Sequence, residues 1–269
     1  MHAAGDDGDL EPVPDHGLAP ERSEPDERLF IASLEKGLRV LEAFSDATTE
    51  LGLQDIAMAT GLGKSAVQRL VYTLFQLDYL RRDPTTRKYR LSPKAFVRGY
   101  VLASTSKLAQ EAHASLVVVN NKCGDTCALT ILEGAEIVIL SSILGRHIDS
   151  LNVTVGMRFP AHSVSSGRVL AAWLPREEAR LVLGERLESL ADDLAAIRRQ
   201  GFYVAEDTNV PGHLSISAPV FDARGHAVAT VNISTLKRRY PAVEMYQGLI
   251  ELVVDAARDI SMRLGHVSR

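Results

Sequence analysis

Apolar residues in the first part of the chain recur at the three- and four-residue spacing of amphipathic helices. The pattern starts in "LFIASLEKGLRVLEAFS", where Leu34, Leu38, Leu41 and Phe44 predict one buried helix face and Ser33 is the expected capping residue. "LQDIAMATGLGKSAVQRLVY" repeats this spacing on both sides of a glycine. These segments predict a small helical domain that begins near residue 29.

Beyond residue 104 the pattern mixes helical spacing with short alternating or continuous apolar runs. Strands are expected on both sides of the Glu-Gly turn in "TCALTILEGAEIVILSSIL", at "SLNVTVG", and at "FYVAED", "LSISAPVFD" and "AVATVNIST". Helices are expected at about 104–121, 165–183, 190–201 and 241–264. Consecutive strands joined by short turns, such as Ala223-Arg224-Gly225, predict an α+β domain with an antiparallel sheet flanked by helices.

The stretch "TGLGKSAVQRL" allows two interpretations. Gly63-Lys64-Ser65 matches the end of a phosphate-binding P-loop, which also needs a glycine five residues earlier and a preceding strand. Met58 occupies that earlier position, and the residues before it have helical spacing. A helix-turn-helix explains more of the stretch, because Ala57 is small enough for close helix crossing and Gly61 suits a left-handed turn.

In that interpretation the second helix is the one that reads DNA. Its apolar residues Val67 and Leu70 point inward, and its polar residues fall on or beside the other face. Amide and guanidinium groups placed there can contact base edges and phosphates in a major groove. We therefore expect DNA contacts from Lys64, Ser65, Gln68 and Arg69, with Gln68 as the better candidate for base readout.

The basic segment "RRDPTTRKYRLS" follows that helix and predicts a β-hairpin around an Asp-Pro-Thr-Thr turn. Such a hairpin is typical of a wing that contacts phosphate or the minor groove; the alternative is a solvated basic loop. Residues 29–100 carry a net charge of +4, against −7 for 1–28 and −1 for 101–269, so the positive charge is local. The wing residues expected to contact DNA are Arg81, Arg82, Arg87 and Lys88.

Composition excludes several classes of protein. A hydrophobic content of 46% and a charged content of 24% are typical of a soluble globular chain, and no apolar run approaches the length that spans a bilayer. The start of the chain lacks the features of a signal peptide, and two cysteines cannot form a disulfide framework, so we expect a cytoplasmic protein. The acidic segment 1–28 is expected to be a disordered tail.

Taken together, these blocks resemble the IclR family of bacterial transcriptional regulators. The resemblance covers roughly residues 30–265 and includes "SLEKGLRVLEAF", "GLGKSAVQRLVYTL", "YLRRDPTTRKYRLS", "VGMRFPAHSVSSGRVLAAWLP" and "SAPVFDARGHAVATVNIS". It implies a winged helix-turn-helix at 29–92, a linker helix at 93–104 that Ser92-Pro93 starts, and a GAF-like effector-binding domain at 105–269. It also implies homodimers or homotetramers on palindromic double-stranded operators, control of catabolic genes, and a small organic acid, often aromatic, as effector.

The resemblance also places the effector pocket between the sheet and the loop in "PAHSVSSGR". The residues that it assigns to this pocket are Ser163, Ser165, Ser166, Gly167, Ser215, Asn232 and Ser234. Two positions depart from the family pattern. Ala205 stands where some members have an acidic residue, which puts the identity of the effector in question. Asp78 stands where many members have glycine, which puts the turn before the wing in question.

The sequence gives weaker support to other functions and sites. A hydrolase that uses the serine-rich loop with His162 as base is the alternative function, but the chain has no G-x-S-x-G motif. His147 can also face the pocket. Cys123 and Cys127 have no partner histidine or second cysteine pair nearby, so reduced thiols are expected rather than a metal site, and no cofactor is expected. The run Lys237-Arg238-Arg239 is either a solvated helix cap or an oligomer contact.

Overall fold

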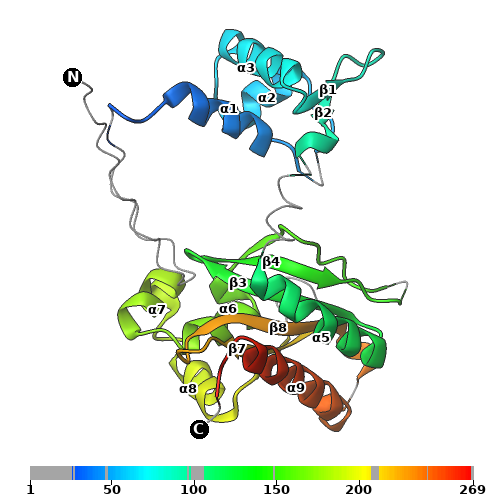
Figure 1. The fold of residues 1–269 in the computed structure, drawn as a ribbon, viewed down its shortest axis with the longest axis vertical. Coiled ribbons are helices and arrows are strands. Elements are labelled where there is room, and N and C mark those ends of the chain that lie inside the picture. Colours follow the sequence, from blue (N-terminus) through cyan, green and yellow to red (C-terminus); the bar gives the residue numbers. More distant parts are fainter. Residues whose placement is uncertain are drawn as a thin grey trace, which may run out of the picture. The chain divides into compact units, whose positions relative to one another are not determined.

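The computed structural model describes residues 26, 28–45, 48–95, 97, 106–147, 149–206, 212–240 and 242–267. The chain forms two compact units, one within Glu21–Ser106 and the other built from Lys107–Arg269 (Figure 1). Nearly all of the expected acidic tail, 1–28, and most of the expected linker helix, 93–104, lie outside the described residues. Within the described part of the chain, no helix is long and apolar enough to cross a membrane.

In the described part of the first unit, three helices precede a β-hairpin. Its elements are α1 (Ala32–Glu42), α2 (Leu53–Thr60), α3 (Lys64–Gln76), β1 (Leu80–Arg82) and β2 (Tyr89–Leu91). The two strands pair antiparallel. Four fully buried side chains, one from α1, one from α2 and two from α3, form the centre of its core: Val40, Ile56, Val67 and Val71. The unit is a winged helix-turn-helix, as predicted.

Helix α1 differs from the sequence prediction in two ways. Ser33 lies inside the helix, which starts after Ile31 without a side-chain cap. The core residue is Val40, whereas Leu34 and Leu38 are 59% and 51% exposed. Leu34 and Leu38 therefore lie beside the core, whereas Phe44 of the same predicted stripe is buried in it and Leu41 packs against it.

The second unit contains the six-stranded sheet. Its strands are β3 (Thr126–Glu133), β4 (Glu136–Ile143), β5 (Arg158–Pro160), β6 (Tyr203–Glu206), β7 (His213–Phe221) and β8 (Ala227–Leu236). They lie in the order β5-β4-β3-β8-β7-β6, and every neighbouring pair is antiparallel. The predicted α+β class is confirmed. The strand expected at 150–156 is wrong, because these residues form no ladder and the edge strand starts at Arg158.

Helices cover both faces of this sheet (Figure 1). One face packs against α5 (Lys107–Cys123) and α9 (Gln247–Arg263), and the other against α6 (Ser165–Ala172), α7 (Arg176–Leu183) and α8 (Ala191–Gln200). The single helical segment expected at 165–183 is divided, because Pro175 lacks the N–H that a continuous helix needs. The last helix begins at Gln247, after a short 3-10 turn at Val243–Tyr246.

Candidate DNA-binding and effector sites

Helices α2 and α3 meet at the left-handed turn that the sequence predicted. Gly61 has φ +68°, a conformation that glycine adopts without steric cost, and α3 starts three residues later. The Arg39 guanidinium of α1 donates a 2.5 Å hydrogen bond to the Thr60 carbonyl at the end of α2. The residues before the turn are helical, and a P-loop needs a strand there, so the P-loop interpretation is wrong.

The polar residues of α3 are exposed together. Val67 and Val71 are fully buried on one side, whereas the four residues expected to contact DNA are exposed: Lys64, Ser65, Gln68 and Arg69. Tyr72 follows Gln68 by one helical turn and is 63% exposed. Tyr72 was not among the predicted DNA contacts, although its four-residue spacing from Gln68 places it on the same face.

The β-hairpin has the form of a wing. Arg81 on β1 lies opposite Arg90 on β2. In the turn, the Asp83 carboxylate accepts hydrogen bonds from the backbone N–H groups of Thr86 (2.7 Å) and Thr85 (2.8 Å), and these bonds lower its pKa. Arg87 closes the turn with φ +58°. The turn therefore has a defined shape.

The wing also carries exposed cations. The Arg82 guanidinium lies 5.7 Å from the centroid of the Tyr89 ring, which holds it along the hairpin. All the wing cations named from the sequence are exposed: Arg81, Arg82, Arg87 and Lys88. Together with the polar face of α3, they give this unit a cationic surface suited to a polyanion.

Serine side chains connect α6 to the sheet in the second unit. The Ser165 hydroxyl, on the first residue of α6, lies 2.6 Å from the Ser217 hydroxyl and accepts a 2.8 Å hydrogen bond from Ser215. All three residues are at most 7% exposed. Ser217 was not among the predicted site residues, although the two-residue period of a strand places it on the same face as Ser215.

The polar group continues onto the neighbouring strands. Ser215 pairs with Ser234 in the β7–β8 ladder, and Ser217 pairs with Asn232. The Asn232 side chain donates to Ser234 at 3.3 Å and accepts a 3.1 Å bond from the Thr130 hydroxyl of β3. We call the set Ser165, Ser215, Ser217, Asn232, Ser234 and Thr130 the sheet-face cluster.

Other residues of the predicted loop have different roles. The Ser163 hydroxyl donates to the Pro160 carbonyl at 2.8 Å and does not join the sheet-face cluster. Gly167 packs so closely on the preceding 3-10 turn that an added Cβ would lie 2.1 Å from the Ala161 carbonyl oxygen. Ser166 is buried beside Ser165. The structure thus brings Ser165 to the strands and uses Gly167 for packing.

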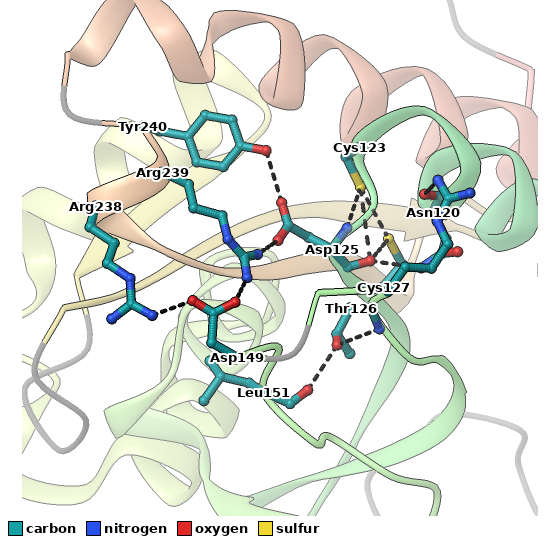
Figure 2. A network of polar contacts seen from close by, with 12 residues as sticks. Asn120, Cys123, Asp125, Thr126, Cys127, Asp149, Leu151, Arg238, Arg239 and Tyr240 are labelled. Atoms are coloured by element: carbon teal, nitrogen blue, oxygen red, sulfur yellow. Dashed lines mark hydrogen bonds and ion pairs between the residues drawn. The ribbon is translucent and has the colours of Figure 1, made fainter.

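A network of ion pairs, one of them buried, connects the loops at one end of the sheet (Figure 2). The Asp125 side chain is 1% exposed, binds the Arg239 guanidinium and accepts a 2.8 Å hydrogen bond from the Tyr240 hydroxyl. Burial and this hydrogen bond raise the pKa of Tyr240. Asp149 binds both Arg238 and Arg239. Lys237 binds Glu206, so all three charges of the basic run pair within the unit, although the Lys237 and Arg238 side chains stay exposed to solvent.

The remaining candidate residues are two cysteines and two histidines. The Cys123 and Cys127 sulfur atoms lie 3.8 Å apart as free thiols, and the hydrogen bond from Cys127 lowers the pKa of Cys123. His147 packs over Gly124, where an added Cβ would lie 2.9 Å from its Nε2 atom. Burial, with the nearby charges of Arg186 and Arg168, lowers the pKa of His162.

Comparison with known proteins agrees with both units. Residues 33–84 match the IclR helix-turn-helix domain, and residues 101–262 match the C-terminal domain of the bacterial transcriptional regulator IclR. The transcriptional regulator XynR of Escherichia coli is 30% identical over 88% of this chain and 98% of its own length. The Pca regulon regulatory protein of Pseudomonas putida is also 30% identical, over 87% of this chain and 84% of its own length.

Solved structures have the same arrangement of elements. A transcriptional regulator from Rhodococcus has a TM-score of 0.77 and 31% identity, covering 87% of this chain and 98% of its own. An IclR homologue from Microbacterium hydrocarbonoxydans, crystallised with 4-hydroxybenzoate, has a TM-score of 0.73 and 25% identity, covering 86% and 98%. The matched family consists of transcriptional regulators, not enzymes, so the hydrolase alternative is wrong. The chain belongs to the IclR family of bacterial transcriptional regulators.

Proposed function

We propose that the protein is a ligand-responsive, sequence-specific regulator of catabolic genes whose effector is a small organic acid, with aromatic acids as the first candidates. The sheet-face cluster carries this proposal, because six polar side chains gathered beneath a helix are more than packing requires. The names of the Pca regulon relative and of the 4-hydroxybenzoate complex support an aromatic acid.

The cluster offers hydroxyl and amide groups to an effector. Ser165 is the first residue of α6, so backbone N–H groups at that helix end can add to the hydroxyl donors around a carboxylate. Ser215 lies opposite Ser234, which places donors from two strands side by side. On β6, Ala205 pairs with Ser215 and contributes no charge. A cluster whose own side chains are uncharged suits an acid with few additional hydroxyl groups.

DNA recognition in this proposal uses the exposed face of α3 and the wing. Gln68 reads a base edge, since an amide bonds adenine in a bidentate way, and Lys64 and Arg69 contact base or phosphate. Arg87 and Lys88 bind backbone phosphate from the wing. A palindromic operator requires two copies with two-fold symmetry.

A second copy also explains an apolar groove in the DNA-binding unit. This groove has a volume of about 1100 Å³ and lies between α1 and α3. Its walls include Leu34, Leu38 and Leu77, each more than half exposed in the single chain. Because monomers rarely expose contiguous apolar surface of this kind, we infer that it is covered when the chain dimerises. Leu38→Lys is expected to shift the protein toward monomer in sedimentation.

Effector binding alters the DNA-bound state only through unequal affinity for two arrangements of the protein. The test of the proposal is thermal stability against a panel of aromatic and aliphatic carboxylates, including 4-hydroxybenzoate. A ligand at 100 times its dissociation constant adds about 2.7 kcal/mol. A selective shift that disappears in Ser215→Ala and Asn232→Ala supports the pocket. The absence of a shift for every acid in the panel contradicts an organic-acid effector.

A further inference from the structure

The effector unit also has a surface groove whose lining includes no residue of the sheet-face cluster. It has a volume of about 270 Å³. It lies where α8 ends at Gly201, beside the part of β7 that does not pair with β6. Its lining on β7 includes Phe221 and reaches back to Ala218, which follows Ser217 of the sheet-face cluster in the chain. Ala218 packs in the core beside α9, on the opposite face of the sheet from Ser217. The two sites therefore do not overlap.

Aromatic rings form one wall of this groove. The Trp173 and Phe221 rings meet edge to face with centroids 4.9 Å apart, and the His266 ring stacks on Phe221 at 5.1 Å. Trp173 is 39% exposed, so part of its surface is open to a ligand. The exposed part of the Trp173 ring offers a flat apolar surface on which a planar group can lie.

Three arginines and, among the described residues, no acidic side chain line the same groove. Arg198 is held in place by the Ala172 and Leu174 carbonyls, beyond the end of α6. Arg258 has only a 3.5 Å pair with Asp255, with both side chains at least 60% exposed, and such pairs are weak. Among the described residues, Arg199 has no carboxylate partner.

Helix electrostatics account for only part of this charge. Arg198 and Arg199 lie in the last turn of α8, where a cation offsets the negative end of the helix dipole. Arg258 lies within α9, so the helix dipole does not explain why it lines the same groove. The three arginines line one groove together with aromatic side chains, and an anion that carries a ring suits this combination of cations and rings.

The size and backbone of the groove define the class of anion. Its volume equals that of about nine water molecules at about 30 Å³ each, which is comparable to one ring with a carboxylate. A peptide strand cannot add here in the usual way, because Pro219 lies in the uncovered part of β7 and lacks an N–H. A small molecule fits these constraints better than an extended chain.

We propose that this groove is a second ligand site, separate from the effector pocket, that binds a one-ring carboxylate. The ring lies against Trp173, and the carboxylate binds Arg199 with Arg258 beside it. The site does not depend on the proposed effector, because it shares no residue with the sheet-face cluster.

The chain offers a direct reporter of this site. Trp173 is the only tryptophan in the sequence, so tryptophan fluorescence reports on the groove alone. The experiment is a titration of the full-length Ser215→Ala variant with benzoate, at constant ionic strength, with acetate as the ring-free probe. Arg199→Gln in the same background removes the proposed anchor. Arg180→Gln is the matched control, since Arg180 also lies in the last turn of a helix, α7.

Saturable quenching by benzoate but not acetate is expected, with the dissociation constant raised at least tenfold by Arg199→Gln and unchanged by Arg180→Gln. Equal binding in the Arg199→Gln variant would overturn the proposal, as would the absence of any saturable signal. A change of oligomeric state in Arg199→Gln would also overturn it, because the groove would then be an interface between copies. Loss of the thermal shift in Ser215→Ala concerns the effector pocket alone, so the two proposals fail separately.

Discussion

The Ser165 and Ser217 hydroxyls lie 2.6 Å apart, which ties the first residue of α6 to the middle of β7. Ser163, two residues earlier, instead bonds the Pro160 carbonyl. Ser165→Ala is therefore expected to weaken effector binding about tenfold, or about 1.4 kcal/mol, whereas Ser163→Ala leaves it nearly unchanged. Calorimetric titration of both variants with the acid that stabilises the unmodified protein makes the comparison. The reverse order of effects would place the pocket at the loop rather than on the sheet.

The wing cations make a quantitative prediction about salt. Each phosphate contact contributes about −0.9 to the slope of log K against log salt concentration. Replacing Arg87 and Lys88 with alanine is expected to make the slope shallower by about 1.8. Fluorescence anisotropy with a DNA duplex at several salt concentrations measures it. The double variant Arg176→Ala, Arg180→Ala on α7 carries the same charge change in the effector unit and serves as control. An unchanged slope in the wing variant would show that these side chains do not touch phosphate.

Asp78 occupies a left-handed backbone position, with φ +57°, just before the wing. A side chain is strained in this conformation, whereas glycine is not, so Asp78→Gly is expected to stabilise the DNA-binding unit by about 0.5–1 kcal/mol. Asp78→Ala is expected to destabilise it, because alanine cannot form the local hydrogen bonds that let aspartate tolerate the conformation. Urea unfolding compares the three proteins. If glycine is no better than alanine, backbone strain does not set stability here.

Asp125 is buried between Arg239 and Tyr240, and its loss leaves part of that polar group without a partner. We expect Asp125→Asn to destabilise the effector unit by about 3 kcal/mol. Asp149→Asn is expected to cost about 1 kcal/mol, because the Asp149 side chain is 31% exposed and water can replace it. Denaturant titration followed by circular dichroism tests both variants. Equal costs for the two would contradict the role of burial.

Local pattern predicted the elements that depend on neighbouring residues. The helix-turn-helix followed from Ala57, Gly61 and Val67, because each constraint acts within a few residues. The same reasoning could have found Tyr72, one helical turn after Gln68, and Ser217, one strand period after Ser215. The same reasoning wrongly predicted a strand at 150–156. Val153 alternates with polar residues as in a strand, yet it packs on the core from a loop.

Long-range pairs were beyond such reasoning. Arg239 binds Asp125 and Asp149, which lie 114 and 90 residues away in sequence. No local spacing relates these positions, so the sequence suggested only a solvated helix cap or an oligomer contact for the run Lys237-Arg238-Arg239. Only the strand order, which brings β3 beside β8, makes the pairing visible.

Arg69 belongs to two surfaces at once. It lies among the exposed polar residues of α3, and it also lines the apolar groove between α1 and α3. A genetic screen for loss of regulation would therefore recover Arg69 substitutions together with those of Leu38, whether the defect were in DNA contact or in assembly. Gln68 lies on the outer face of the helix and does not line the groove. Alleles at Gln68 are thus the ones that separate operator choice from dimer formation.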